Sequence, residues 1–149
     1  MMIVRGNINI DVSKIILGTG SYSTVLSGNM FFITGDAGNV FLLRQAMKYS
    51  GFDQFLKGIS SSDYLYIGYS AGSVILSKDL SGFRGIDDEV FYRSKADLLY
   101  EGLSLIDYLF IPHYQSNYRY RLIHSLVEDC KKNDIRFQAV RDGDVIIKY

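Results

Sequence analysis

The sequence predicts an α/β fold built on a mostly parallel sheet, in a single domain covering residues 1–149. Three short apolar runs support this prediction, and none of them alternates with polar residues: residues 30–33, 64–67 and 108–111. Strands in parallel sheets are buried on both faces, so they appear as continuous apolar runs. A chain of 149 residues suits one domain with a sizeable core.

The first 29 residues give weaker signals. Residues 7–12 alternate apolar and polar side chains, which is typical of an edge strand, whereas residues 18–28 indicate an irregular loop rich in Gly, Ser and Thr. Residues 40–49 carry apolar side chains at helical spacing, and Gly51 follows as a stop signal. We expect a second, short helix over residues 52–56.

The C-terminal third predicts one long helix and a hairpin. Residues 118–132 place five apolar side chains on one face, which is the pattern of a helix lying on a sheet: Leu122, Ile123, Leu126, Val127 and Cys130. Residues 136–141 and 145–149 are two further runs. They are joined by Asp142-Gly143, a turn dipeptide typical of a hairpin.

The second apolar run leads into a Gly-x-Ser-x-Gly motif at residues 68–72, with an apolar helical pattern after it. Glycines on both sides allow a sharp strand-to-helix turn, so this context predicts a nucleophile elbow with Ser70 at its tip. The backbone N–H of Ala71 would then point toward a developing oxyanion. The motif alone is also compatible with an ordinary glycine-rich turn.

A serine nucleophile needs a base within hydrogen-bond reach and a group that orients the base. His113 follows the third apolar run directly after Pro112, whereas His124 lies in the middle of the predicted helix. The carboxyl ends of parallel strands meet at one edge of a sheet, so we expect His113 and Ser70 to converge there with the Gly-rich segment at residues 35–39.

The orienting acid is expected between the nucleophile and the base in the chain. The segment at residues 84–89 offers Asp87, Asp88 and Glu89, although a solvated acidic loop is an equally good interpretation of each one. Three other aspartates compete less well: Asp79, Asp97 and Asp107.

Charge and cysteine content exclude several classes of protein. The chain has 16 basic and 16 acidic residues and no run of Lys or Arg. It therefore lacks the excess of positive charge that is typical of a nucleic-acid-binding protein. A single cysteine, Cys130, rules out an internal disulfide and fits a reducing cytoplasm. No stretch is long and apolar enough to cross a bilayer, and no signal peptide is evident. We therefore expect a cytoplasmic protein that binds neither nucleic acid nor membrane.

The ordered set of motifs resembles the peptidase E family of serine peptidases, which includes aspartyl dipeptidase and cyanophycinase. The matching pieces are the glycine-rich loop at residues 35–39 before Leu42-Leu43, the elbow at residues 68–72, and Pro112-His113-Tyr114. Residues 102–107 and 141–144 also resemble segments of that family. The resemblance covers about residues 30–149 and implies a three-layer sandwich of the glutamine-amidotransferase-like (flavodoxin-like) type.

The resemblance also implies roles for individual residues. Ser70 would be the nucleophile and His113 the general base, with Asp88 as the first choice for the acid and Asp87 close behind. Backbone N–H groups of Ala71 and of the loop at Ala37-Gly38, here assigned to Gly38, would form the oxyanion hole. The family's preference for an aspartyl residue points to Arg119 and Arg121 as substrate-binding cations, and the reaction needs no metal or cofactor.

The expected activity is hydrolysis of a peptide or isopeptide bond in small Asp-containing peptides. Two alternatives stay open: a catalytically silent relative that binds a ligand or partner, and a small esterase. Members of this family begin with additional strand and helix units, so the chain is expected to be an N-terminally shortened member. We expect a homodimer or larger homo-oligomer in which residues 1–28 help to cover the exposed sheet.

Overall fold

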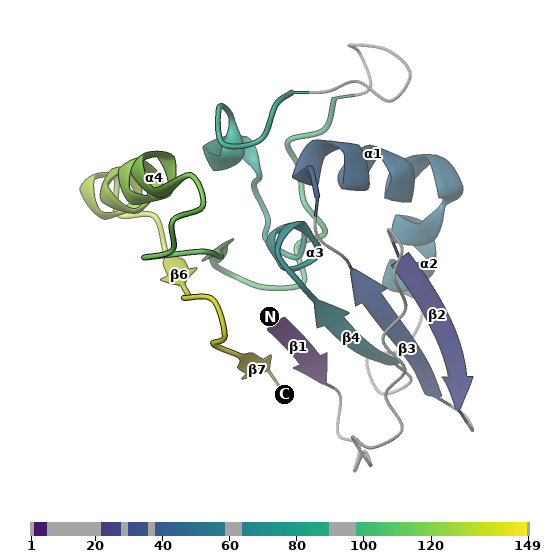
Figure 1. Cartoon of the computed structure of the whole chain (residues 1–149). Helices are drawn as coiled ribbons and strands as arrows, with labels where there is room; N and C mark the ends of the chain where they lie inside the picture. The colour runs from purple at the N-terminus through teal and green to yellow at the C-terminus, as the bar shows by residue number, and fades with distance from the viewer. Residues whose placement is uncertain are drawn as a thin grey trace.

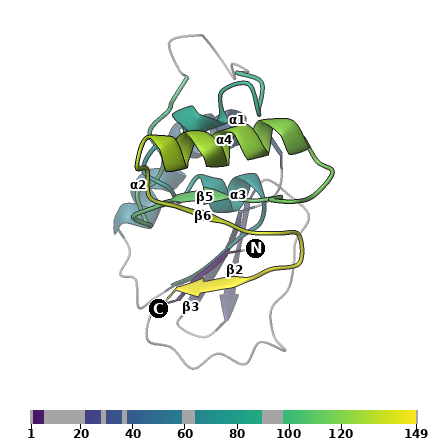
Figure 2. The ribbon, with the colours of Figure 1, turned by 90° about the vertical axis from the view of Figure 1, so that its left-hand side faces the viewer.

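The computed structural model describes residues 2–5, 22–27, 30–35, 38–58, 64–89 and 98–148. Figure 1 labels the strands β1 (Met2–Arg5), β2 (Tyr22–Ser27), β3 (Met30–Gly35), β4 (Tyr64–Gly68), β6 (Phe137–Ala139) and β7 (Ile146–Lys148), and Figure 2 labels β5 (Leu109–Ile111). The helices are α1 (Val40–Ser50), α2 (Phe52–Gly58), α3 (Ala71–Val74) and α4 (Tyr120–Lys132), with a 3₁₀ helix at Ser81–Phe83. These elements form a mixed α/β structure.

Five strands make one sheet in the order β2-β3-β4-β1-β7, and β5 pairs with β6 in a separate parallel ribbon. Strands β3 and β4 are parallel, and Gly35 pairs with Gly68, so both strands end at the same edge. Strand β2 runs antiparallel to β3, and β1 runs antiparallel to β4 but parallel to β7. The sheet is therefore mixed and not mostly parallel as expected, whereas the three-layer arrangement stays a prediction.

Two local predictions are wrong. Residues 22–27 form strand β2, although their Ser and Thr content indicated a loop, because the paired strand β3 supplies hydrogen-bond partners that the local sequence does not reveal. The predicted hairpin at residues 136–149 is absent because β6 pairs with β5 and β7 pairs with β1. The predicted edge strand at residues 7–12 lies outside the described residues.

Helix α1 begins at Val40 as the sequence predicted and ends at Ser50, one residue later than predicted. Asn39 begins it as the N-cap, because its side-chain oxygen accepts hydrogen bonds from the backbone N–H groups of Phe41 and Leu42. Gly51 ends it in the left-handed conformation with φ 74°, and its N–H bonds the carbonyl of Lys48. These two caps fix where α1 begins and ends, and the N-cap lies directly after Gly38.

Helix α4 begins at Tyr120, two residues later than predicted, because Arg119 adopts a left-handed conformation with φ 44°. Its buried face carries Ile123, Leu126, Val127 and Cys130. Leu122, which the pattern assigned to the same face, leaves 44% of its surface exposed.

The hydrophobic core lies between the sheet and the helices. Helices α1, α2 and α3 lie to one side of β3 and β4 in Figure 1, and α4 lies beyond the β5–β6 ribbon, as the turned view in Figure 2 shows. The largest fully buried side chains come from several elements: Phe41 and Met47 of α1, Tyr66 of β4, Phe110 of β5 and Ile123 of α4. The Tyr66 hydroxyl donates to the carbonyl of Gly72, which ties β4 to α3.

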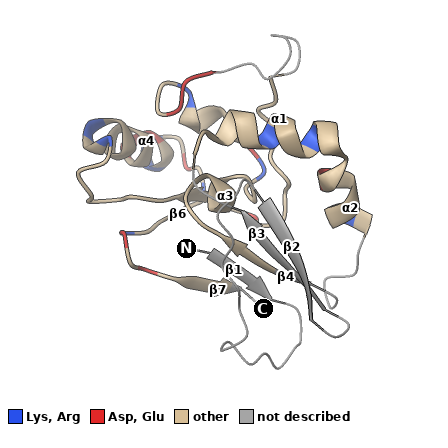
Figure 3. Cartoon of the chain, turned by 45° about the vertical axis from the view of Figure 1, so that its right-hand side comes forward, with Lys and Arg blue, Asp and Glu red and all other residues tan. Residues whose placement is uncertain are grey.

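Basic residues are dispersed in the part of the chain that the structure describes. Figure 3 shows Lys and Arg on α1, α2, α4 and the connecting loops, and acidic residues lie between them. No helix among the described residues has the length and apolar character needed to cross a membrane.

Candidate active site

Ser70 lies at the tip of the predicted strand-to-helix elbow. Strand β4 ends at Gly68, Ser70 has φ 49° and ψ −118°, and helix α3 begins at Ala71. A side chain at position 68 would place its Cβ 2.7 Å from the carbonyl oxygen of Gly72, so only glycine allows this close approach of strand and helix. A positive φ at a non-glycine residue is strained, and such strain is characteristic of functional sites.

His113 reaches Ser70 from the neighbouring ribbon. It follows β5 after Pro112, has φ 62°, and places its Nε2 2.9 Å from the Oγ of Ser70. The two residues are 43 positions apart, so the contact depends on how β4 and β5 are placed. The structure therefore brings together the nucleophile and the base that the sequence predicted.

Asp142 completes a chain of hydrogen bonds. Its Oδ1 lies 2.6 Å from the Nδ1 of His113. The pairing of β5 with β6 continues past both strands, because the N–H of Val140 donates to Ile111 and the N–H of Tyr114 donates to Val140. This pairing carries the next turn of the chain, which contains Asp142, to the imidazole.

Asp142 is a residue of this site that the sequence does not predict. The dipeptide Asp142-Gly143 predicts a hairpin turn, although residues 141–144 are among the segments that resemble the peptidase E family. The sequence does contain a signal, because Asp142 follows shortly after the carboxyl end of a short strand, β6, which ends at Ala139. The parallel pairing of β5 and β6, which gives this signal its meaning, is a tertiary feature.

The three acids proposed from the sequence have other contacts. Asp88 is exposed, and its backbone carbonyl accepts a hydrogen bond from the Asn39 side chain at 2.6 Å. Glu89 accepts from Arg84 and from Tyr100. Among the described residues, the carboxylate within hydrogen-bond distance of His113 Nδ1 is that of Asp142, and Asp88 does not take that position.

Asp87 is buried beside the cavity. Its Oδ2 accepts a hydrogen bond from the backbone N–H of Val40 at 2.8 Å, and its Oδ1 lies 3.7 Å from Nη1 of Arg119. Burial raises the pKa of the Asp87 carboxyl above its ordinary value, and the Val40 N–H and the Arg119 charge only partly oppose this effect.

Backbone N–H groups suited to an oxyanion lie close to Ser70. Within α3, the N–H groups of Gly72 and Ser73 donate to preceding carbonyls, whereas the N–H of Ala71 has no acceptor among the described residues. Gly38 has φ 137° and lines the same cavity as Ser70. The backbone of Gly38 takes a conformation that disfavours any other residue.

A cavity of about 430 Å³ joins these residues. Its wall comes from the loops after β3, β4, β5 and β6: Gly38, Tyr69, Ser70, His113, Tyr118 and Asp142. Arg119 also lines it, whereas Arg121 is exposed on α4 and does not contribute to the wall. The convergence that the strand endings predicted is present in the structure.

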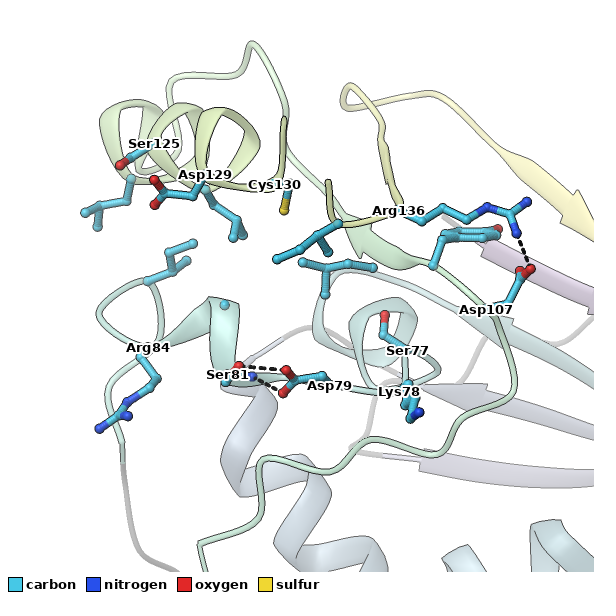
Figure 4. A pocket seen from close by; sticks show the side chains of 17 residues that line it. Ser77, Lys78, Asp79, Ser81, Arg84, Asp107, Ser125, Asp129, Cys130 and Arg136 are labelled. Atoms are coloured by element: carbon cyan, nitrogen blue, oxygen red, sulfur yellow. Dashed lines mark hydrogen bonds and ion pairs between the residues drawn. The ribbon is translucent and has the colours of Figure 1, made fainter. Parts of the chain in front are cut away.

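A larger cavity of about 530 Å³ lies elsewhere, between α4, the 3₁₀ helix and β5 (Figure 4). Ser125 and Asp129 border it from α4, and the ion pair of Asp107 with Arg136 closes its other end. Ser70 does not line it. Size alone therefore does not identify the site with catalytic geometry.

Metal ligands are not grouped in the described part of the chain: no set of three or more His, Cys, Asp or Glu side chains is placed to hold an ion. The polar groups around Ser70 are instead arranged as successive hydrogen-bond partners.

Comparison with known proteins agrees with this geometry. The family model of peptidase family S51 matches residues 6–148. A crystal structure of a candidate peptidase E protein from Listeria monocytogenes EGD-e is similar, with 26% sequence identity and a TM-score of 0.56 over 76% of this chain. The match covers 52% of the Listeria chain, so this chain spans about half of its length. No curated protein matches significantly. With a family match over nearly its whole length, the chain belongs to peptidase family S51.

Proposed function

We propose that the protein is a serine peptidase in which Ser70, His113 and Asp142 act as a catalytic triad. One observation carries the proposal: a continuous series of hydrogen bonds, 2.9 Å from Ser70 to His113 and 2.6 Å from His113 to Asp142, begins at a strained elbow. Membership of a peptidase family supports this assignment. The order nucleophile, base and orienting acid is the one that acyl transfer requires.

The proposed reaction has two halves. Ser70 Oγ attacks the scissile carbonyl carbon while His113 Nε2 takes the hydroxyl proton. Collapse of the tetrahedral intermediate breaks the C–N bond, and His113 returns that proton to the leaving amine. Water then attacks the acyl carbon and gives a proton to His113, which passes it to the departing Ser70 oxygen. Asp142 holds the Nδ1 proton, so that Nε2 stays available as the base.

Two backbone groups are proposed to stabilise the oxyanion. The N–H of Ala71 is one, because it lacks an acceptor within the described structure and follows the nucleophile directly. The loop at Gly38 would supply the second from the opposite wall of the cavity. One such donor is worth about 10²- to 10³-fold in rate, so loss of the donor at Gly38 should have a measurable effect.

The proposed substrates are small peptides that contain aspartate. The cavity of about 430 Å³ is in the range that suits small-molecule ligands of about 300–1,000 Å³. Arg119 is the Lys or Arg side chain in its wall among the described residues, and it can pair with a substrate carboxylate. Arg121, the other arginine predicted from the sequence, is exposed outside the cavity and becomes a natural control.

A serine-directed fluorophosphonate tests the proposal. Intact mass should show one adduct that is lost in Ser70→Ala and kept in Ser73→Ala. Ser73 is a matched control because it lies three residues further along the same elbow, buried and outside the cavity wall. Absence of an adduct on the wild-type chain would favour the silent-relative alternative. Faster hydrolysis of short acyl esters than of Asp-X dipeptides would favour the esterase.

A further inference from the structure

Asp87 lies at a junction of three segments that surround the cavity. It belongs to the loop after the elbow helix, but its Oδ2 bonds the N–H of Val40, the first residue of α1, at 2.8 Å. Its Oδ1 faces the guanidinium of Arg119, the residue before α4, at 3.7 Å. Only 12% of the Asp87 side chain is exposed. A buried carboxylate in this position links elements that are 47 and 32 residues away in the chain.

The next residue makes a second link to the same loop. The backbone carbonyl of Asp88 accepts a hydrogen bond from the Asn39 side chain at 2.6 Å. The oxygen of that same amide group caps α1 through Phe41 and Leu42. Two consecutive residues, Asp87 and Asp88, therefore hold the start of α1 from outside the helix.

The loop that they hold contains the proposed second oxyanion donor. Gly38 directly precedes Asn39 and lines the Ser70 cavity. A Cβ built on Gly38 would meet no atom within 4 Å in the part of the chain that the structure describes. Hydrogen bonds to the adjacent residues, Asn39 and Val40, are the contacts in that part of the chain that hold the backbone next to Gly38.

We propose that Asp87 is a positioning residue, which fastens the loop at Gly38 and the guanidinium of Arg119 against the Ser70 cavity before substrate binds. This role rests on the proposed function and differs from that of a triad acid, because Asp87 acts through Val40 and Arg119. A preorganised donor avoids a reorganisation cost during reaction. A displacement of about 1 Å in such a group can cost about 10²-fold in rate.

The charged form of Asp87 is the form that fastens the loop, because a carboxylate accepts the Val40 N–H and attracts Arg119 more strongly than a neutral carboxyl does. Three ionisable groups act on it: Arg119 and His113 favour its charge, and Asp88 opposes it. Burial is the largest influence and raises its pKa. The signal of the Val40 amide should therefore report protonation of Asp87 at a pH above 3.8, the ordinary pKa of this side chain.

Amide NMR of the full chain tests the contact without relying on activity. In the wild-type protein, the Val40 ¹H–¹⁵N signal should titrate with a midpoint above pH 3.8, and Asp87→Asn should abolish that transition. Asp107→Asn is the matched control, because Asp107 also pairs with an arginine but lies on the surface away from Ser70. A Val40 signal that does not titrate, or that titrates equally in Asp87→Asn, would overturn the proposal.

Labelling by an alkyl fluorophosphonate then tests the oxyanion loop separately from Arg119, because this probe has no carboxylate for the guanidinium to bind. Asp87→Ala, which loses the acceptor, should slow labelling by about 100-fold, whereas Asp87→Asn, which keeps an oxygen for Val40 but loses the charge, should slow it by a smaller factor. Wild-type labelling rates in Asp87→Ala would refute the positioning role. If the wild-type chain forms no adduct at all, the proposed peptidase function fails, and the Val40 titration still decides whether Asp87 holds the loop.

Discussion

Asp142 Oδ1 lies 2.6 Å from His113 Nδ1, although the two residues are 29 positions apart and follow different strands. The contact exists because β5 and β6 are parallel and end side by side. Asp142 is nevertheless 56% exposed at its side chain, so water competes for its carboxylate. Its orienting effect on the histidine should therefore be smaller than that of a fully buried acid.

Substituting the acid distinguishes Asp142 from the acid predicted by sequence. Asp142→Asn should lower kcat by about 10²-fold or more, because the amide favours the wrong imidazole tautomer, a change worth about 10⁴-fold where the acid is buried. Asp88→Asn should cost at least tenfold less. Steady-state kinetics with one Asp-X dipeptide measure both variants. A larger loss in Asp88→Asn than in Asp142→Asn would return the triad role to Asp88.

Removing the hydroxyl of Ser73 should stabilise the protein. Its Oγ is buried and has no hydrogen-bond partner among the described residues. An unsatisfied buried polar group costs about 1–3 kcal/mol, so Ser73→Ala should raise the free energy of unfolding by about 1 kcal/mol. Urea denaturation measures the change. A loss of stability would mean that the hydroxyl has a partner in solution, such as an internal water.

Arg119 should determine the preference for acidic substrates. Arg119→Met should reduce the ratio of kcat/KM for Asp-X over Ala-X by about 10- to 100-fold, because a charged hydrogen bond is worth about 1.5–3 kcal/mol. Arg121→Met, on the exposed side of α4, is the matched control and should leave the ratio within about twofold. The assignment is wrong if the two variants have equal ratios.

Ionisation of Asp87 should lower the free energy of unfolding as pH rises. The pKa of Asp87 in the folded protein is raised above 3.8, its ordinary value. The stabilisation that the protonated carboxyl gives is therefore fully present below the pKa of the unfolded chain and is lost as pH rises through the pKa of the folded protein. Asp87→Asn is neutral throughout. The difference in unfolding free energy, wild type minus Asp87→Asn, should therefore decrease with rising pH in urea titrations at stepped pH. An increase would show that folding favours the ionised carboxyl.

The homodimer expected from the sequence stays a prediction. Val145, just before strand β7, leaves 47% of its surface exposed, and Ile147, within the strand, leaves 50% exposed. Strand β7 is at the end of the described sheet order, where unpaired backbone groups favour association. Sedimentation equilibrium at micromolar protein should give twice the chain mass. A monodisperse species of 16.9 kDa would contradict the prediction.

The features predicted correctly are those that local sequence controls. The elbow at Ser70 depends on glycines two residues away on each side, and α1 depends on its periodicity and on Gly51 as its C-cap. His113 was found because a proline and a histidine directly follow an apolar run. In each case the deciding residues lie within one or two turns of each other.

The features that were missed depend on pairing between distant segments. Asp142 reaches the site only because β6 pairs with β5. The local sequence Asp-Gly indicates a turn, but it does not determine which strands the turn connects. Strand β2 is recognisable only beside β3. Arg119 and Arg121 look equivalent in sequence, and the left-handed backbone of Arg119 is what separates them. Tertiary contacts decide these cases, since local propensity is a weak constraint on strands and turns.

The position of β1 has a consequence for how the protein is made. This strand lies between β4 and β7, and its residues Met2, Ile3 and Val4 pair with residues 146–148, which follow much later in the chain. On the ribosome, this part of the sheet cannot form until β7 has emerged, and such distant pairing is slow to form. Asp142 lies just before β7, so the nascent protein has Ser70 and His113 in place before the residue that completes the His113–Asp142 contact is available. The order of translation thus leaves the serine without its full hydrogen-bond series until the segment that contains Asp142 has followed.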